Sequence, residues 1–227
     1  MRLIISVGLC VSAIALAADS PARAAARVKN DVGMEALGRR ELEAATEAFA
    51  AAVKADPSWA LPPYNQACAM ALQYATDRCG IDRDEALRLL ETSIGLDGKR
   101  KKRLLEDRDL TSLRRALRFH VLAGRAFDNP KDVSAMLREV AWFGEPTPGV
   151  FGPSGGITFK ANTFTAWTLE FVDDVPTRPK VSGTWRVDGA DVVLQLEGRE
   201  LRGTLRERGL SFPGLGDFRD EADECGA

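Results

Sequence analysis

The chain has few of the side chains from which catalytic and metal sites are built. Among its 227 residues there is one histidine, His120, and there are four cysteines with no Cys-x-x-Cys pair. A structural zinc site draws four ligands mostly from histidine and cysteine, and this sequence offers no such set. His120 lies in an apolar and basic helical stretch, where we expect a partly buried surface histidine. We therefore expect a protein that is not an enzyme, with no catalytic residue, no metal and no cofactor.

A strong excess of charge of either sign is also lacking. The 31 Lys and Arg residues nearly balance the 33 Asp and Glu residues, which leaves a formal net charge of −2. The densest basic cluster, "KRKKR" at 99–103, is followed almost at once by "EDRD" at 106–109, which offsets it. Proteins that bind nucleic acid carry a dominant basic patch. The balance therefore favours a solvated surface here and no nucleic-acid partner.

The apolar run at the start of the chain is too short to span a membrane. Met1 and Arg2 precede an apolar stretch from Leu3 to Ala18, whereas a spanning helix needs ~20 residues. A positive charge, a short apolar run and then small residues are typical of a secretory signal peptide. Small-x-small cleavage sites end at Ala17 and Ala24. We expect a cleaved leader and a periplasmic or secreted protein, with no stable membrane insertion after cleavage.

Three cysteines remain after such a cleavage: Cys68, Cys79 and Cys225. An exported protein meets oxidising conditions, in which a disulfide is stable. Cys79 and Cys225 lie in polar, turn-like stretches, whereas Cys68 lies among alanines in a predicted helix. We predict a Cys79–Cys225 disulfide with Cys68 left as a buried thiol. A local Cys68–Cys79 pair is the alternative.

The hydrophobic pattern changes period part-way along the chain. Up to residue 143 it is helical, as in "RDEALRLLETSIGL" at 83–96, where the apolar residues form one stripe. Beyond residue 156 short runs rich in Val, Thr, Phe and Trp alternate with turn signals such as Asp188-Gly189. The expected fold class is α+β, with a small antiparallel β-meander of about five or six strands, either a sandwich or a partial barrel. The expected parts are a signal peptide (1–24), a helical domain (26–143), a linker (144–156) and a β-rich domain (157–227).

A short regular stretch, "EAATEAFAAAVKADP" at 43–57, specifies the packing of the first helices. Small residues at Gly33, Ala45 and Ala52 allow two antiparallel helices to approach closely, and Phe49 fills the gap that the alanines leave. Pro57 then ends the second helix. With residues 26–59 taken as one unit, this spacing resembles the tetratricopeptide (TPR) repeat, a helix-turn-helix unit of about 34 residues.

Weaker copies of the same pattern follow. "YNQACAMAL" at 64–72 and "DEALRLLETSIGLD" at 84–97 resemble the two helices of a second unit, with a longer connection between them. "DRDLTSLRRALRF" at 107–119 resembles the segment that caps a stack of such repeats. The resemblance covers about residues 26–125, and the β-rich half resembles no family firmly.

The resemblance implies a protein or peptide partner, bound on the face formed by the first helix of each unit. Carried over to this sequence, the facing positions are Asn30, Met34 and Leu37 in the first unit and Tyr64, Asn65, Cys68 and Ala71 in the second. The expected function is a non-enzymatic interaction module of the periplasm or cell envelope. Two alternatives stay open: the groove is filled by later helices of the same chain, or the aromatic residues of the β half form a carrier for a small molecule or lipid.

Overall fold

The computed structural model describes residues 19–145 and 153–220, so the leader prediction for residues up to 18 and Cys225 fall outside the described residues. The helices are α1 (Pro21–Gly38), α2 (Leu42–Ala55), α3 (Leu61–Thr76), α4 (Arg83–Leu96), η1 (Gly98–Arg103), η2 (Thr111–Arg115), α5 (Leu117–Leu122) and α6 (Pro130–Glu139), η1 and η2 being 3₁₀-helices. The strands are β1 (Trp142–Gly144), β2 (Gly155–Lys160), β3 (Thr163–Thr168), β4 (Glu170–Val172), β5 (Val175–Thr177), β6 (Lys180–Asp188), β7 (Asp191–Leu196), β8 (Arg199–Arg206), β9 (Gly209–Phe212) and β10 (Gly216–Arg219). Helices thus precede an antiparallel β region, as the change of period predicts.

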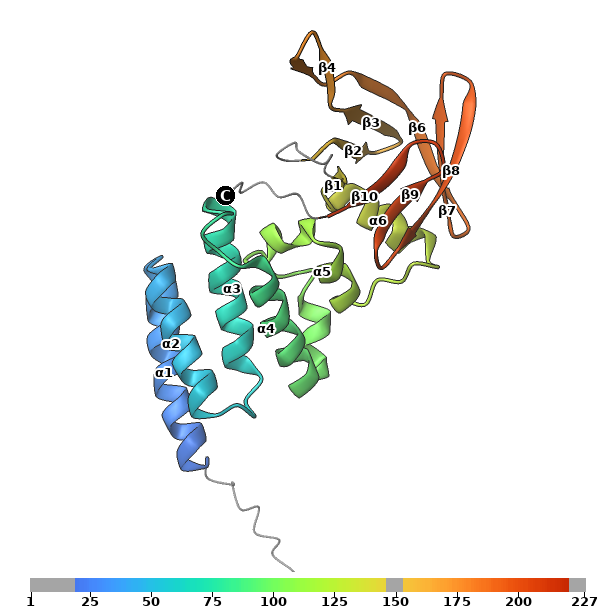
Figure 1. The fold of residues 1–227 in the computed structure, drawn as a ribbon. Coiled ribbons are helices and arrows are strands. Elements are labelled where there is room, and N and C mark those ends of the chain that lie inside the picture. Colours follow the sequence, from blue (N-terminus) through green and yellow to red (C-terminus); the bar gives the residue numbers. More distant parts are fainter. Residues whose placement is uncertain (1–18, 146–152, 221–227) are drawn as a thin grey trace, which may run out of the picture.

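The first four helices form a row of antiparallel neighbours, α1 to α4, in chain order (Figure 1). Local signals set their ends. Ser20 and Asp82 cap α1 and α4 by accepting hydrogen bonds from the backbone N–H groups of Arg23 and Glu85. α2 stops at Ala55, and Asp56 follows as its C-cap directly before Pro57. Because α1 begins at Pro21, cleavage after Ala17 would keep its cap, whereas cleavage after Ala24 would remove its first turn.

The small-residue pattern of the first two helices produces the contact that the sequence predicts. A Cβ atom added to Gly33 would lie 2.5 Å from Cε1 of Phe49, so the ring occupies the space that the glycine leaves. Phe49, Ala45 and Ala52 are fully buried beside it. The ring of Phe49 therefore packs directly against the backbone of Gly33 and fills the interface between α1 and α2.

Regular helix gives way to tighter turns after α4. The basic stretch expected to continue as a helix from residue 99 forms η1, and the capping segment forms η2 and the short α5. Apolar side chains anchor this irregular path in the core shared with α3 and α4, where Leu104, Leu110, Leu113 and Phe119 are fully buried. A run of five charged residues cannot supply a helical apolar stripe, which is a physical reason for the difference.

The β region is a closed barrel of eight strands in the order β1-β10-β9-β8-β7-β6-β3-β2, and the separate hairpin β4–β5 extends from one end of it. The expectation of a sandwich or partial barrel is corrected by the pairing of β1 with β10, which closes the sheet. β1 and β10 have three and four residues, so each is too short to show an alternating pattern in the sequence. The stretch expected to be a linker, 144–156, contains the end of β1 and the start of β2.

Helix α6 belongs to the barrel core. Its buried residues Val133, Met136 and Leu137 share one apolar cluster with the inward-facing aromatic residues of the strands. Trp142 on β1 donates from Nε1 to the carbonyl oxygen of Leu137, 3.1 Å away, and so fixes the helix to the strand that follows it. Val140, directly after α6, is buried in the same cluster. The helix therefore covers part of the barrel that the strands leave open.

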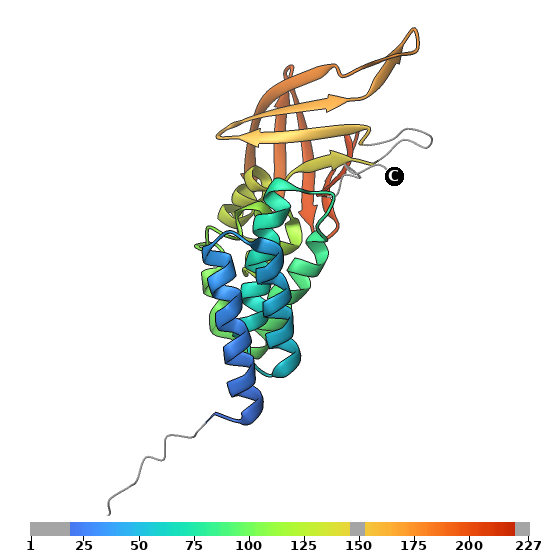
Figure 2. The same ribbon diagram turned by 90° about the vertical axis from the view of Figure 1, so that its left-hand side faces the viewer.

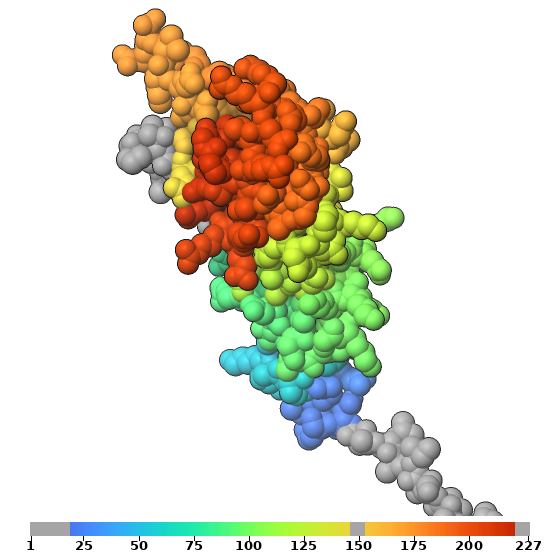
Figure 3. Space-filling model, turned by 90° about the vertical axis from the view of Figure 1, so that its right-hand side faces the viewer, coloured from blue at the N-terminus to red at the C-terminus, as the bar shows by residue number. Residues whose placement is uncertain are grey.

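The molecule is elongated, with the helical row at one end and the barrel at the other (Figures 2 and 3). Asp220, directly after β10, joins the two ends: its Oδ2 accepts from the N–H of Leu117 at 2.7 Å, and its carbonyl oxygen accepts from Arg83 at 3.1 Å. Among the described residues, no helix has the length and apolar character needed to cross a membrane.

Candidate functional site

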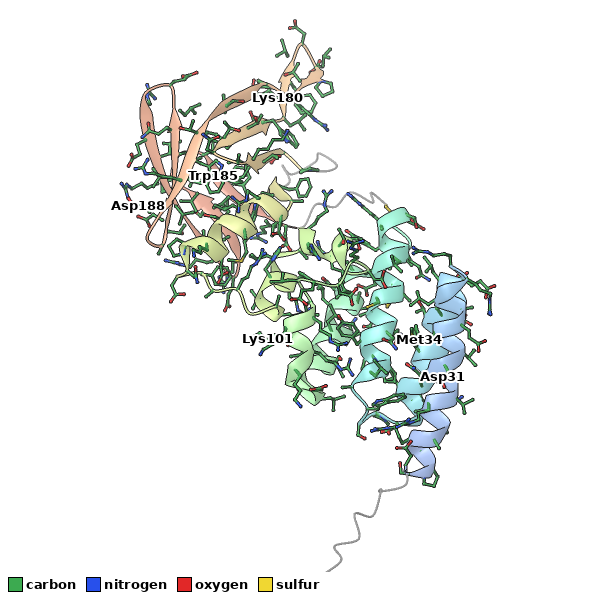
Figure 4. The ribbon with its side chains drawn as sticks, turned by 180° about the vertical axis from the view of Figure 1, so that it is seen from behind. Asp31, Met34, Lys101, Lys180, Trp185 and Asp188 are labelled. Atoms are coloured by element: carbon green, nitrogen blue, oxygen red, sulfur yellow. The ribbon has the colours of Figure 1, made fainter. Side chains whose placement is uncertain are left out.

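The face predicted to bind a partner is partly open. Asn30 on α1 and Asn65 on α3 meet there, with Nδ2 of Asn65 donating to Oδ1 of Asn30 at 2.9 Å and to Sδ of Met34 at 3.5 Å. Met34 is 47% exposed, and Figure 4 places it on α1 beside α3. The structure therefore brings three of the predicted residues, Asn30, Met34 and Asn65, to one spot, where Met34 is exposed, Asn65 is half-buried and Asn30 is only 4% exposed.

The other predicted positions are covered by the chain itself. Tyr64 is 5% exposed, and its hydroxyl donates to Asp107 at 2.8 Å while the guanidinium of Arg100 lies 5.6 Å from its ring centre. Burial, together with this hydrogen bond, raises the pKa of Tyr64 well above its usual value. Cys68, one turn along α3, is buried under the same segment, and Leu37 packs beside the cluster that contains Phe49. The segment from η1 to η2 thus fills the second unit's half of the predicted groove.

The two asparagine amides keep unused hydrogen-bonding groups. In the described part of the chain, Nδ2 of Asn30 donates to no acceptor and Oδ1 of Asn65 accepts from no donor. An amide side chain can make four hydrogen bonds, and the contact between the two amides uses one group of each. The half-buried Asn65 therefore offers a free acceptor beside the exposed side chain of Met34, whereas the free donor of Asn30 belongs to a residue that is only 4% exposed.

A second candidate site is a cavity of about 360 Å³ at the end of the barrel from which the β4–β5 hairpin leaves. Its apolar lining includes Ala166, Val181, Leu215 and Phe218, and the buried side chains of Ala166 and Phe218 belong to the barrel core. Further lining residues are Gly144, Glu145, Ser154, Gly155, Trp167, Thr168, Glu170, Pro179, Gly216 and Asp217. The sequence interpretation missed this site because its glycines were taken for a linker.

Carboxylates stand at the edge of this cavity. Glu145 forms an ion pair with Arg219 at 2.6 Å, and Glu170 accepts a hydrogen bond from the hydroxyl of Thr168 at 3.5 Å. Asp217 alternates along β10 with the inward-facing Phe218, so its side chain faces the outer surface of the barrel. The cavity lining contains no lysine or arginine. The cavity is therefore mostly apolar, and the two carboxylates at its edge, those of Glu145 and Glu170, both have polar partners.

Trp167 lies at the same rim, held flat against the barrel. A Cβ atom added to Gly156 would lie 2.6 Å from Nε1 of Trp167, so the ring crosses the bare backbone of the neighbouring strand. The guanidinium of Arg178 lies over this ring, 5.0 Å from its centre. Trp167 alternates with Ala166, so its side chain and Arg178 belong to the outer surface of the barrel.

The aromatic residues of the β half, considered above as a carrier site, lie in different environments. Phe159, Phe164 and Trp185 are buried in the barrel core, where Phe159 and Trp185 make an edge-to-face contact. Trp185, labelled in Figure 4, donates from Nε1 to the carbonyl oxygen of Lys160 at 3.1 Å. Phe171 is 55% exposed on β4. These side chains pack the barrel interior or face solvent, and the cavity lies only at the mouth.

Groups of catalytic type are dispersed. The pentapeptide 152–156 has the Gly-x-Ser-x-Gly spacing of a hydrolase nucleophile, but Ser154 lies directly before β2, not between a strand and a helix. Its hydroxyl donates to the carbonyl oxygen of Glu145. His120, the single histidine of the sequence, is fully buried in the helical half. The described residues therefore assemble no serine–histidine pair.

His120 has a structural arrangement instead. Its Nε2 lies 2.7 Å from the carbonyl oxygen of Arg114, and its Nδ1 lies 2.9 Å from Nη1 of Arg125, which also binds Glu139 at 3.0 Å. A guanidinium only donates, so Nδ1 accepts and the ring is neutral with its proton on Nε2. Burial lowers the pKa of His120 to about 4. Within the described ranges, no group of three or more His, Cys, Asp or Glu side chains could hold a metal ion.

The cysteine predictions divide in the same way. Cys68 is a buried free thiol, as predicted, so the alternative Cys68–Cys79 pair is wrong. Cys225 lies outside the described residues. The Cys79–Cys225 disulfide therefore stays a prediction, which peptide mapping without reductant would test.

Comparison with known proteins adds no assignment. No family model matches the chain, and neither the curated proteins nor the solved structures contain a match. The two candidate sites therefore provide the observations that bear on function.

Proposed function

We propose that the protein is a non-enzymatic interaction module of the periplasm or cell envelope, in which TPR-like repeats bind a peptide or partner protein between α1 and α3. The observation that carries the proposal is the pair of adjacent amides of Asn30 and Asn65 beside Met34. The fit of Phe49 against Gly33 supports the repeat assignment, because the family's small and aromatic positions meet where the resemblance expects them.

The amide pair suits an extended peptide. Each residue of an extended chain presents one C=O and one N–H group, and the free acceptor on the half-buried Asn65 can pair with a peptide N–H. Met34 adds an adaptable apolar contact, as methionine does at many peptide-binding surfaces. The covered half of the groove limits the bound segment to a few residues on the α1 side.

A peptide selection with point variants tests this proposal. Random peptides displayed on phage are selected against the chain beginning at Ala18, and the enriched peptides are titrated by fluorescence polarisation. Asn65→Ala and Met34→Glu are each expected to weaken binding roughly tenfold, which corresponds to about 1.4 kcal/mol. Val28→Glu is the matched control, because Val28 is 67% exposed on the same helix outside the Asn30–Met34–Asn65 spot. No enriched peptide, or an equal loss in the Val28 variant, would contradict the proposal.

The second candidate function is a carrier of a small molecule, for which the cavity at the barrel mouth is the supporting observation. Small-molecule sites in proteins have volumes of about 300 to 1,000 Å³ and are mostly apolar with a few polar groups. The cavity of about 360 Å³ lies within this range and has that composition. It would hold a ligand at the rim, since aromatic side chains fill the interior.

A further inference from the structure

We infer that the cavity at the barrel mouth binds a single uncharged alkyl chain, such as that of a medium-chain alcohol. This inference rests on the carrier candidate and is independent of the peptide-binding proposal. The charge and the size of the ligand follow from the side chains that line the cavity and from the way in which the two ends of the barrel differ.

One end of the barrel is covered by a helix, and the cavity lies at the other end. α6 covers the end at which β1 begins, where Trp142 donates to the carbonyl oxygen of Leu137. β1 runs from there to Gly144, which lines the cavity. The apolar core of the barrel therefore extends from α6 to a second end, where it opens into a space of about 360 Å³.

Strand β6 shows that the cavity is an unfilled part of the core. Val181 and Trp185 both lie on the inner face of the barrel, because they are separated by an even number of residues along the strand. Trp185, nearer to the covered end, is 8% exposed, whereas Val181, at the open end, is 38% exposed. Val181 pairs across the sheet with the buried Ala166. A ligand would remove this inward-facing apolar surface from water, which favours binding.

The size of the cavity suits one chain. Leu215 and Phe218 supply further apolar lining from the β9–β10 turn and from β10. On another side the lining is bare backbone, since a Cβ atom added to Gly144 would lie 3.2 Å from Cα of Gly155. The volume is near the lower end of the range of about 300 to 1,000 Å³ for small-molecule sites. The space therefore fits one alkyl chain and is too small for a lipid with two long chains.

The polar groups at the edge favour an uncharged ligand. No lysine or arginine is among the described residues that line the cavity, so an anion would find no counter-ion there. Glu145 and Glu170 are exposed to water, and their partners are Arg219 and the hydroxyl of Thr168. A charged group inside the apolar part would lose its hydration without gaining a partner. A charged group that stayed in water at the mouth would hold its chain part of the way out.

Probes of different length and charge test the ligand class. 1-Hexanol, 1-octanol and 1-decanol are titrated into the chain beginning at Ala18 by isothermal calorimetry. Octyltrimethylammonium and octyl sulfate are titrated in the same way, below their micelle concentrations. Each added methylene that enters the cavity is expected to strengthen binding roughly fourfold. 1-Octanol is expected to bind roughly tenfold tighter than either charged octyl compound, because only the charged heads resist entry.

A variant of Val181 locates the ligand. Val181→Asp places a carboxylate inside the cavity at a position that is already partly exposed, so the fold should tolerate it. It is expected to weaken the binding of 1-octanol roughly tenfold and to make octyltrimethylammonium the tighter ligand. Thr184→Asp is the matched control, because Thr184 is exposed on the outer face of the same strand. Circular dichroism checks that both variants fold.

The outcomes separate the inference from the candidate on which it rests. Equal or tighter binding of a charged octyl compound to the unaltered protein would overturn the uncharged class and leave the carrier candidate standing. Failure of every probe to bind would overturn both. Binding of 1-octanol that is unchanged in Val181→Asp, or weakened equally in Thr184→Asp, would place the ligand outside the cavity and overturn the inference.

Discussion

At the scale of single residues, a few small or polar side chains decide how the helical half packs. Gly33 has no side chain, so the Phe49 ring can touch its backbone, and the buried Asn30 accepts a hydrogen bond from the amide of Asn65. His120 is buried because both ring nitrogens have partners. Each of these residues satisfies a neighbour from another element, so each substitution has a defined structural cost.

Replacing Gly33 with alanine is expected to destabilise the protein. The new Cβ atom would overlap the fully buried Phe49 ring, and such overpacking costs typically about 1–3 kcal/mol. Urea unfolding monitored by circular dichroism measures the loss. Gly38→Ala in the same helix is the control, because nothing lies within 4 Å of its added Cβ atom. A stability equal to that of the control would contradict the tight fit.

The buried His120 makes stability depend on pH. Its pKa of about 4 in the folded protein is below the value of ~6.5 in the unfolded chain, so the unfolded state binds the proton more readily. The contribution of His120 to the free energy of unfolding is therefore fully present above pH ~6.5. It is lost as the pH drops towards 4, and the total loss is about 3 kcal/mol. Urea unfolding at several pH values measures the slope. His120→Gln should flatten it, and an unchanged slope in that variant would contradict the assignment to His120.

At the scale of elements, the β4–β5 hairpin forms a small sheet of its own, separate from the barrel. Its side chains Val172 and Val175 are 55% and 59% exposed, and the turn between them places Asp173 and Asp174 at positive φ. The pair Val172→Thr/Val175→Thr is therefore expected to change the free energy of unfolding by no more than ~0.5 kcal/mol. The same change at the buried residue Val192 is the contrast. A loss above 1 kcal/mol in the hairpin variant would mean that the hairpin packs on another part of the protein.

The elements also mark how far the sequence could predict the structure. The packing of α1 against α2 was predictable because it depends on the local spacing of Gly33, Phe49 and Pro57 in the sequence. Barrel closure was not, because the pairing of β1 with β10 joins residues far apart in the chain through strands too short to show a period. The contact of Asp107 and Arg100 with Tyr64 could not be predicted either, because a stretch of charged residues by itself predicts a solvent-exposed surface. At the candidate sites, Asn30, Met34 and Asn65 were predicted. The cavity was not, because its lining residues lie far apart in the sequence and only the fold brings them together.

At the scale of the whole molecule, Asp220 links the barrel to the helical half, in addition to the hydrogen bond from the N–H of Ala141 to the carbonyl oxygen of Arg115. Asp220 accepts from the backbone N–H of Leu117 at the start of α5, and the chain reaches this contact only after completing the barrel. Asp220→Ala is expected to lower the free energy of unfolding by about 1 kcal/mol, through the loss of a partly buried hydrogen bond. Hydrogen exchange at the Leu117 amide should also become faster. Asp191→Ala, which removes an exposed carboxylate near Arg202, is the control and should have little effect.

The pairing of the first barrel strand with the last has a consequence for the order in which the protein forms. Chains emerge from the ribosome N-terminus first, and α1 to α4 make their contacts with near neighbours in sequence, so they can settle early. β1 must wait for β10, some seventy residues later. Until then it presents an unpaired edge to any other strand within reach. A chain truncated before Gly216 is expected to keep its helical row and to lose the β1–β10 pairing, so the formation of β10 is the step that closes the barrel.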